Sequence, residues 1–191
     1  MSTARASFTL IAVASRDGFI TGPRGEPPRE WASPEEQLLF AETVSALDWS
    51  FMGRSTHVEA WRPDRRRVVF SRSFRTPLWQ HPRRLWVDPE RVAFETILAA
   101  LQPVHPPARC GILGGVQVHD WFAARGLIDA ADITIEPVVF GGGLPLFSHG
   151  ATNDPAAAMA ALGLVETDVM TLNAAGSRLH RFSRPASRAR R

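Results

Sequence analysis

The stretch from Cys110 to Phe122 constrains the fold more than any other part of the sequence, because it combines a strand, two glycines and a helix. Its first residues, 110–113, are short and apolar, as in a buried strand, and Gly114 and Gly115 follow directly. One face of the next segment carries apolar residues at helical spacing, namely Val118, Trp121 and Phe122. Gly126 is placed to end this helix. A strand that passes directly into a helix is the repeating unit of an α/β sheet.

The glycine pair at this junction is a candidate binding feature. Glycines let a ligand approach the backbone closely, and the first turn of a helix offers unpaired N–H groups and the positive end of the helix dipole. A phosphate group suits such a place. On this stretch alone, a plain tight turn between strand and helix explains the pair equally well, because it matches neither the G-x-G-x-x-G pattern nor a Walker loop.

Two other expected strands also end in residues that suit a phosphate. The segment 53–56, Gly-Arg-Ser-Thr, follows an expected strand over 49–52, and Ser-Arg-Ser at 71–73 follows one over 68–70. The planar fork of arginine matches a phosphate dianion, and hydroxyl groups add donors. Because ligands of α/β sheets bind outside the carboxyl ends of the strands, we expect the three loops to converge on one crevice.

Strands alternate with helices along most of the chain, which predicts an α/β fold with a mainly parallel central sheet of about eight strands, flanked by helices. Residues 164–172 and 178–182 predict an antiparallel C-terminal hairpin, and residues 133–140 predict a strand interrupted by Pro137. The sequence predicts helix starts at Ser33-Pro34 and at Asp88-Pro89. We expect one domain over residues 1–182 and a basic disordered tail over residues 183–191.

The composition excludes several classes of enzyme. All 22 basic residues are arginine, and the chain has neither lysine nor tyrosine. Schiff-base and pyridoxal-phosphate enzymes, P-loop ATPases and Tyr-Lys short-chain dehydrogenases are therefore excluded. The single cysteine, Cys110, excludes an intrachain disulfide and a zinc centre of the cytidine deaminase type, and no metal site is expected. One cysteine fits a reducing compartment, so we expect the protein in the cytoplasm.

The net charge of +3 says little about partners. The last eight residues contain four arginines, so the rest of the chain is close to neutral. A solvated basic tail explains this better than nucleic-acid binding does. No apolar run approaches the length of a membrane span. We therefore expect a small-molecule substrate as the partner, and neither nucleic acid nor a membrane.

Seven motifs occur in order along residues 8–182. They are Ser15-x-Asp17-Gly18-x-Ile20, Trp31 before a capped helix, Asp48-x-x-x-Met52-Gly53-Arg54-x-Thr56, Val69-x-Ser71-x-Ser73, Gly114-Gly115, Gly126-Leu-Ile-Asp129 and Pro137-x-x-x-Gly141-Gly-Gly-x-x-x-Phe147. Together they resemble the dihydrofolate reductase-like superfamily. The more similar branch contains the reductase domain of bacterial riboflavin biosynthesis, the RibD C-terminal domain, because Ser-x-Asp-Gly and Gly-Leu-Ile-Asp favour it.

This resemblance implies NADPH as the hydride donor. It implies that Arg54, Ser71 and Arg72 hold the 2′-phosphate of the adenosine. The pyrophosphate would lie on the helix starts after Gly53 and Gly115, and the nicotinamide would lie beside Val13 and Ile20. The residues expected at these helix starts and beside the nicotinamide are Gly53, Thr56, Gly114, Gly115, Val116, Gln117, Val13 and Ile20. As in the folate reductases, the Gly114–Gly115 peptide bond is expected to be cis.

The resemblance also suggests where the substrate lies. In folate reductases a carboxylate in the helix after the tryptophan promotes protonation of the pterin, and Glu36 follows Trp31 at matching spacing. Ser33-x-x-Glu36 is equally a capping box, in which the glutamate binds the backbone of the helix start, and we favour capping while keeping Glu36 as the candidate catalytic acid. Trp31, Phe40 and Phe147 are expected to line a dry substrate pocket.

We therefore predict an NADPH-dependent reductase that transfers hydride to a C=N or C=O carbon, with Glu36 or water as the proton donor. The riboflavin-type substrate would be 5-amino-6-ribosylaminouracil 5′-phosphate, whose ring-opened ribose is reduced. Dihydrofolate reduction, a stand-alone family member with another small substrate, and a binding protein without catalysis stay open as alternatives. A homodimer formed through the antiparallel strands is expected, as is common in the resembling family.

Overall fold

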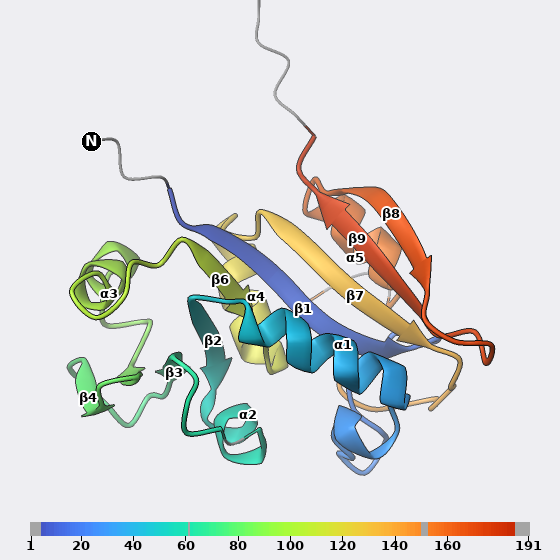
Figure 1. Ribbon diagram of the computed structural model, residues 1–191, viewed down its shortest axis with the longest axis horizontal. Helices are drawn as coiled ribbons and strands as arrows, with labels where there is room; N and C mark the ends of the chain where they lie inside the picture. Colours follow the sequence, from blue (N-terminus) through green and yellow to red (C-terminus); the bar gives the residue numbers. More distant parts are fainter. Residues whose placement is uncertain (1–4, 61, 150–152, 186–191) are drawn as a thin grey trace, which may run out of the picture.

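The computed structural model describes residues 5–60, 62–149 and 153–185. Helices and strands alternate along most of these residues (Figure 1). The strands are β1 (Ser7–Ser15), β2 (Trp49–Gly53), β3 (Arg67–Phe70), β4 (Leu78–His81), β5 (Arg84–Val87), β6 (Arg109–Ile112), β7 (Ala130–Glu136), β8 (Val165–Thr171) and β9 (Arg178–Ser183). The α-helices are α1 (Pro34–Ser45), α2 (Arg54–Glu59), α3 (Phe94–Leu101), α4 (Val116–Ala124) and α5 (Pro155–Ala161), and a short 3-10 helix, η1, spans Pro28–Glu30.

Within the described residues, the strands form one sheet of nine in the order β4-β5-β3-β2-β6-β1-β7-β9-β8. The six strands from β5 to β7 in this order are mutually parallel, and β4, β9 and β8 run antiparallel to their neighbours. The predicted α/β fold with a mainly parallel sheet and a C-terminal hairpin is confirmed. The ninth strand, β4, was not expected, because Leu78–His81 forms a short exposed edge strand without a clear apolar pattern.

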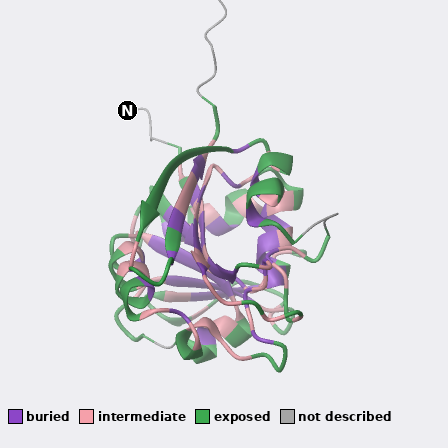
Figure 2. Ribbon diagram, turned by 90° about the vertical axis from the view of Figure 1, so that its right-hand side faces the viewer, coloured by how far each residue is buried: buried purple, intermediate pink, exposed green. Residues whose placement is uncertain are grey.

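The two faces of the sheet differ in chemistry. On one face, tilted and edge-to-face contacts join aromatic rings of β1, β2, α3 and α4, among them Phe8, Phe51, Phe94 and Phe122. Phe8, Phe51 and Phe122 are almost wholly buried, and buried residues gather in the interior of the molecule (Figure 2). The opposite face is covered by α1, which lies in front of the sheet in Figure 1 and shares a small cavity with residues of β1 and β7. There β7 presents polar side chains, and this contrast points to the α1 side as the place of a functional site.

Two predicted boundaries are wrong. Helix α3 begins at Phe94 rather than at Asp88, because Asp88 accepts a hydrogen bond from the backbone of Glu90 in a turn that precedes the helix. Strand β7 ends at Glu136, one residue before Pro137, whose missing N–H cannot continue the ladder.

The first two residues of the expected tail, Ser183 and Arg184, still contact the sheet and its loops. Ser183 belongs to β9, and the guanidinium group of Arg184 donates to the carbonyl groups of Gly126 and Ile128. These loop carbonyls need donors, which the arginine fork supplies. The remainder of the predicted tail, residues 186–191, lies outside the described residues. No helix within the described ranges is long and apolar enough to cross a membrane.

Candidate active site

The three predicted phosphate loops lie side by side at the carboxyl edge of the sheet. Strand β2 lies between β3 and β6, so the segments that follow these strands are neighbours. The N–H of Gly53 donates to the carbonyl of Gly114 over 2.8 Å, which joins the first loop to the third. A Cβ atom built on Gly115 would lie 3.9 Å from the hydroxyl oxygen of Thr56. The three loops therefore lie along one continuous stretch of the sheet edge, at the place of the expected crevice.

The glycine pair has the expected backbone. The Gly114–Gly115 bond is cis, as predicted, and Gly114 has a φ of +98°, a conformation that glycine adopts without a steric penalty. A Cβ atom on Gly114 would come within 3.0 Å of the Nε2 atom of His119. Gly115 is the N-cap of α4, so the N–H groups of Val116 and Gln117 lie in the first turn, where helices have no internal acceptor.

The cations and hydroxyls of the crevice differ in exposure. Arg54 and Arg72 are exposed, whereas Thr56 and Ser71 are half-buried. The backbone of Ser71 is fixed by a hydrogen bond from its N–H to the carbonyl of Val87. The loops therefore hold the hydroxyl groups in place, while the two guanidinium groups face solvent at the carboxyl edge.

The His119 side chain lies against the glycine pair. It is buried, and its Nδ1 atom lies 2.9 Å from the carbonyl oxygen of Leu146. Burial lowers the pKa of His119 to about 4, so the ring is neutral, with the proton on Nδ1 for that bond. The Phe147 ring packs against the His119 ring at 6.0 Å. This histidine, which the sequence reasoning missed, links the segment before Phe147 to the glycine pair.

Glu36 lies in the first turn of α1 and is buried, with 5% exposure. The capping box is only half formed. The N–H of Glu36 donates to the Ser33 hydroxyl, but the N–H of Ser33 donates to Glu136, at 2.9 Å. The favoured interpretation of Glu36 as a capping residue is therefore wrong, because a different glutamate takes the position that its carboxylate would fill.

Burial raises the pKa of Glu36 to about 7, and the negative charge of Glu136 adds to this effect. A cavity of about 10 Å³, close to the space that one water molecule needs, adjoins Glu36. Its walls include Phe40, Asp132 and Thr134. A carboxyl group that holds its proton near neutral pH, next to space for one water, is suited to act as a general acid.

The raised pKa predicts that Glu36→Gln stabilises the fold at higher pH. The folded chain keeps the Glu36 proton up to about pH 7, whereas the unfolded chain releases it near the ordinary value of 4.5. Stability therefore falls as the pH rises through this window. The variant lacks this loss. The free energy of unfolding of the variant minus that of the wild type should therefore rise by about 2–3 kcal/mol between about pH 5 and about pH 8.

Urea unfolding of both proteins at the two pH values checks this. Glu35→Gln is a matched control, because Glu35 is exposed and its carboxylate accepts a hydrogen bond from Asn173. Glu35→Gln should not show the increase in stability at higher pH that is expected for Glu36→Gln. A variant-to-wild-type difference that is the same at both pH values would contradict the raised pKa.

The apolar residues predicted to line the substrate pocket contact different parts of the chain. The Trp31 ring contacts Phe140 at 5.1 Å, and its Nε1 atom donates to the carbonyl of Glu26. Phe40 adjoins Glu36, and Phe147 lies against His119. Val13 and Ile20 are buried in β1 and in the loop that follows it.

Asp17 fixes the loop after β1. Its carboxylate accepts hydrogen bonds from the Ser15 hydroxyl and from the N–H groups of Phe140 and Gly141. Burial works to raise the pKa of Asp17, but these hydrogen bonds together lower it below its usual value. The Ser-x-Asp-Gly motif thus joins the loops that follow β1 and β7 at the carboxyl edge of the sheet.

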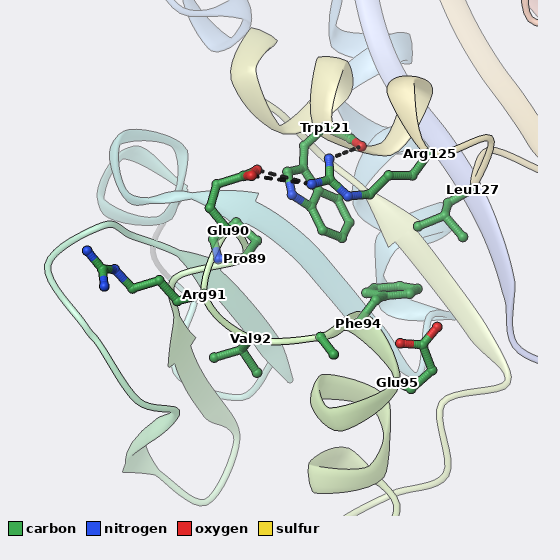
Figure 3. Close-up of a pocket in the computed structure, with 10 residues that line it drawn as sticks. Pro89, Glu90, Arg91, Val92, Phe94, Glu95, Trp121, Arg125 and Leu127 are labelled. Atoms are coloured by element: carbon green, nitrogen blue, oxygen red, sulfur yellow. Dashed lines mark hydrogen bonds and ion pairs between the residues drawn. The ribbon is translucent and has the colours of Figure 1, made fainter.

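A larger groove, of about 420 Å³, lies between the loop before α3 and the middle of α4. Figure 3 shows Arg125 over the Trp121 ring, at 4.1 Å, with the carboxylate of Glu90 beside its guanidinium group. None of the predicted cofactor or substrate residues lines this groove.

The sheet order, and the solved structures that share it, give the chain a dihydrofolate reductase-like fold. The family model of the RibD C-terminal domain matches residues 7–172, so the chain belongs to that family. No curated protein matches the chain in sequence.

Solved structures share the fold. A riboflavin biosynthesis protein from Shewanella sp. PV-4 has 20% identity and a TM-score of 0.69, with 94% of this chain and 99% of that one covered. A deaminase/5-amino-6-(5-phosphoribosylamino)uracil reductase from Thermotoga maritima has 16% identity and a TM-score of 0.66, with 95% of this chain covered. The chain spans 57% of the length of that protein. Dihydrofolate reductase from Enterococcus faecalis, complexed with NADP(H), has 18% identity and a TM-score of 0.64, with 95% of this chain and 98% of that one covered.

Proposed function

We propose that this protein is an NADPH-dependent reductase of the riboflavin-pathway type, which transfers hydride to the C=N or C=O carbon of a small substrate. The observation that carries the proposal is the convergence of three loops, with their arginines, hydroxyls and glycine pair, beside the face that holds Glu36. Membership of the RibD C-terminal domain family and a neighbour complexed with NADP(H) support it.

The crevice residues fit a dinucleotide. Gly53 and Gly115 leave room beside the backbone that a side chain would fill, next to the Thr56 hydroxyl. The first turn of α4 offers N–H donors for a pyrophosphate. Arg54 and Arg72, with the Ser71 hydroxyl, would bind the 2′-phosphate, and Val13 and Ile20 would form the apolar wall beside the nicotinamide.

NADPH supplies the hydride when bound. The residues of the chain position the substrate, exclude water and provide the proton. The Glu36 carboxyl group holds a proton near neutral pH, and it would deliver this proton directly or through one water in the adjoining cavity. Trp31, Phe40 and Phe147 would line the substrate side of the active site, outside this small cavity.

Two measurements test the proposal. Titration of the purified protein with NADPH should show saturable binding, and NADPH oxidation should be seen with 5-amino-6-ribosylaminouracil 5′-phosphate. Oxidation with dihydrofolate instead would identify the protein as a folate reductase, for which the buried carboxyl group of Glu36, on the helix that follows Trp31, is the favouring observation. Binding without oxidation of NADPH by pyrimidine, pterin or carbonyl substrates would indicate a binding protein.

We also propose that the protein is a cytoplasmic homodimer, joined through β8. All seven residues of this edge strand are exposed, and an edge strand with exposed side chains and unpaired backbone groups favours pairing with another copy. The single cysteine, which is buried, is consistent with a reducing compartment.

The dimer predicts the effect of a charge on β8. The wild type should sediment at twice the 21.0 kDa of one chain, and Val169→Asp should sediment as a monomer, because Val169 is 43% exposed on β8. Val104→Asp is the matched control, since Val104 is 45% exposed in the segment before β6. A wild-type mass of 21.0 kDa at micromolar concentration would contradict the dimer.

A further inference from the structure

Strand β7 places three polar side chains in a row on the covered face of the sheet. Asp132, Thr134 and Glu136 alternate with Ala131 and Ile133, which belong to the aromatic core on the other face. Thr134 and Glu136 are each 3% exposed. Buried polar groups are costly unless they are bonded or used.

Glu136 is held by three hydrogen bonds from two other parts of the chain. One carboxylate oxygen accepts from the N–H and the hydroxyl of Ser33, at 2.9 and 2.7 Å. The other accepts from the hydroxyl of Ser177, just before β9, at 2.5 Å. The end of β7, the N-cap of α1 and the C-terminal hairpin are thus joined through one carboxylate.

This anchor determines where Glu36 lies. Ser33 is the N-cap of α1 and Glu36 is in its first turn, so the bonds to Glu136 fix the turn that carries Glu36. The two carboxyl groups also repel each other when both are charged.

The other charged groups on this face do not offset that repulsion. Asp132 is the remaining acid of β7 on this face, and it lies 4.0 Å from Arg181 of β9. Arg181 also binds Asp168 of β8 at 2.9 Å. Strand β1 contributes apolar residues there, such as Ile11. Glu35, the other acid in the first turn of α1, is exposed and bound to Asn173.

We propose that Glu136 is a positioning residue for Glu36: its anchored carboxylate fixes the first turn of α1 on the sheet and keeps the Glu36 side chain in its proton-bearing form. This inference rests on the proposed reductase function, in which Glu36 is the acid. A purely structural link would need only the hydrogen bonds of Glu136, whereas the proposed role also needs its charge.

Carbon NMR titration of the glutamate carboxyls tests this without cofactor or substrate, with the Glu36 signal assigned by its absence in Glu36→Gln. Glu136→Gln keeps the shape and can still bond Ser33 and Ser177 but removes the charge. The midpoint of the Glu36 titration should therefore fall by about one pH unit or more. Glu136→Asp, which restores the charge, should keep the midpoint raised, and Glu35→Gln should leave it unchanged.

Ser177→Ala covers the case in which Glu136→Gln does not fold. It removes one of the donors that hold the Glu136 carboxylate in place, so the negative charge is fixed less firmly beside α1, and a smaller fall of the midpoint is expected. An unchanged midpoint in the folded variants overturns the inference. Absence of NADPH oxidation with an altered midpoint overturns the proposed function instead, so the two failures are distinct.

Discussion

Replacing Arg54 or Arg72 with alanine is expected to weaken NADPH binding about ten- to a hundredfold and to leave NADH binding nearly unchanged. The two cofactors differ only by the 2′-phosphate, and hydrogen bonds from charged donors contribute roughly 1.5–3 kcal/mol each. Both arginines follow neighbouring strands, β2 and β3, and both are exposed at the carboxyl edge. Titration of NADPH and NADH against the wild type and both variants measures the effect.

Arg109→Ala serves as the control. Its guanidinium group is also exposed, but it lies at the start of β6, at the amino edge of the sheet. Its removal should change neither affinity. If Arg54 and Arg72 are only solvated surface residues, neither variant will distinguish the cofactors. Equal affinity of the wild type for NADH and NADPH would overturn the cofactor assignment.

The adjacency of the three loops could be predicted because its information is local. Each loop follows its strand directly, and the parallel strands bring their carboxyl ends to one edge. The glycine pair and the residues 53–56 and 71–73 needed no knowledge of distant contacts. Sequence placed these loops at the same edge, and strand order made them adjacent.

The acid site could be predicted only in part. The spacing after Trp31 identified Glu36, but the capping pattern could not say which carboxylate binds the N–H of Ser33. That partner is Glu136, about a hundred residues further along the chain. The alternation of Asp132, Thr134 and Glu136 with apolar residues was a usable signal, since it places acids on a face that a helix covers.

Glu36→Gln is expected to lower kcat about a hundredfold or more while leaving NADPH affinity and the fold intact, because a positioned general acid contributes 10²–10⁴-fold. The wild-type rate should fall as the pH rises through about 7, where Glu36 loses its proton. The variant should lose this decline together with most of its activity. Steady-state kinetics across this pH range, with the substrate that supports NADPH oxidation, measures both effects.

Glu35→Gln separates the acid from its neighbour on the same turn of α1, since Glu35 is exposed and should affect neither rate nor pH profile. The gain in stability predicted for Glu36→Gln at higher pH makes the comparison sharper, because a variant that folds more stably yet turns over more slowly cannot have lost activity by unfolding. A kcat within about twofold of the wild type would assign proton delivery to water rather than to Glu36.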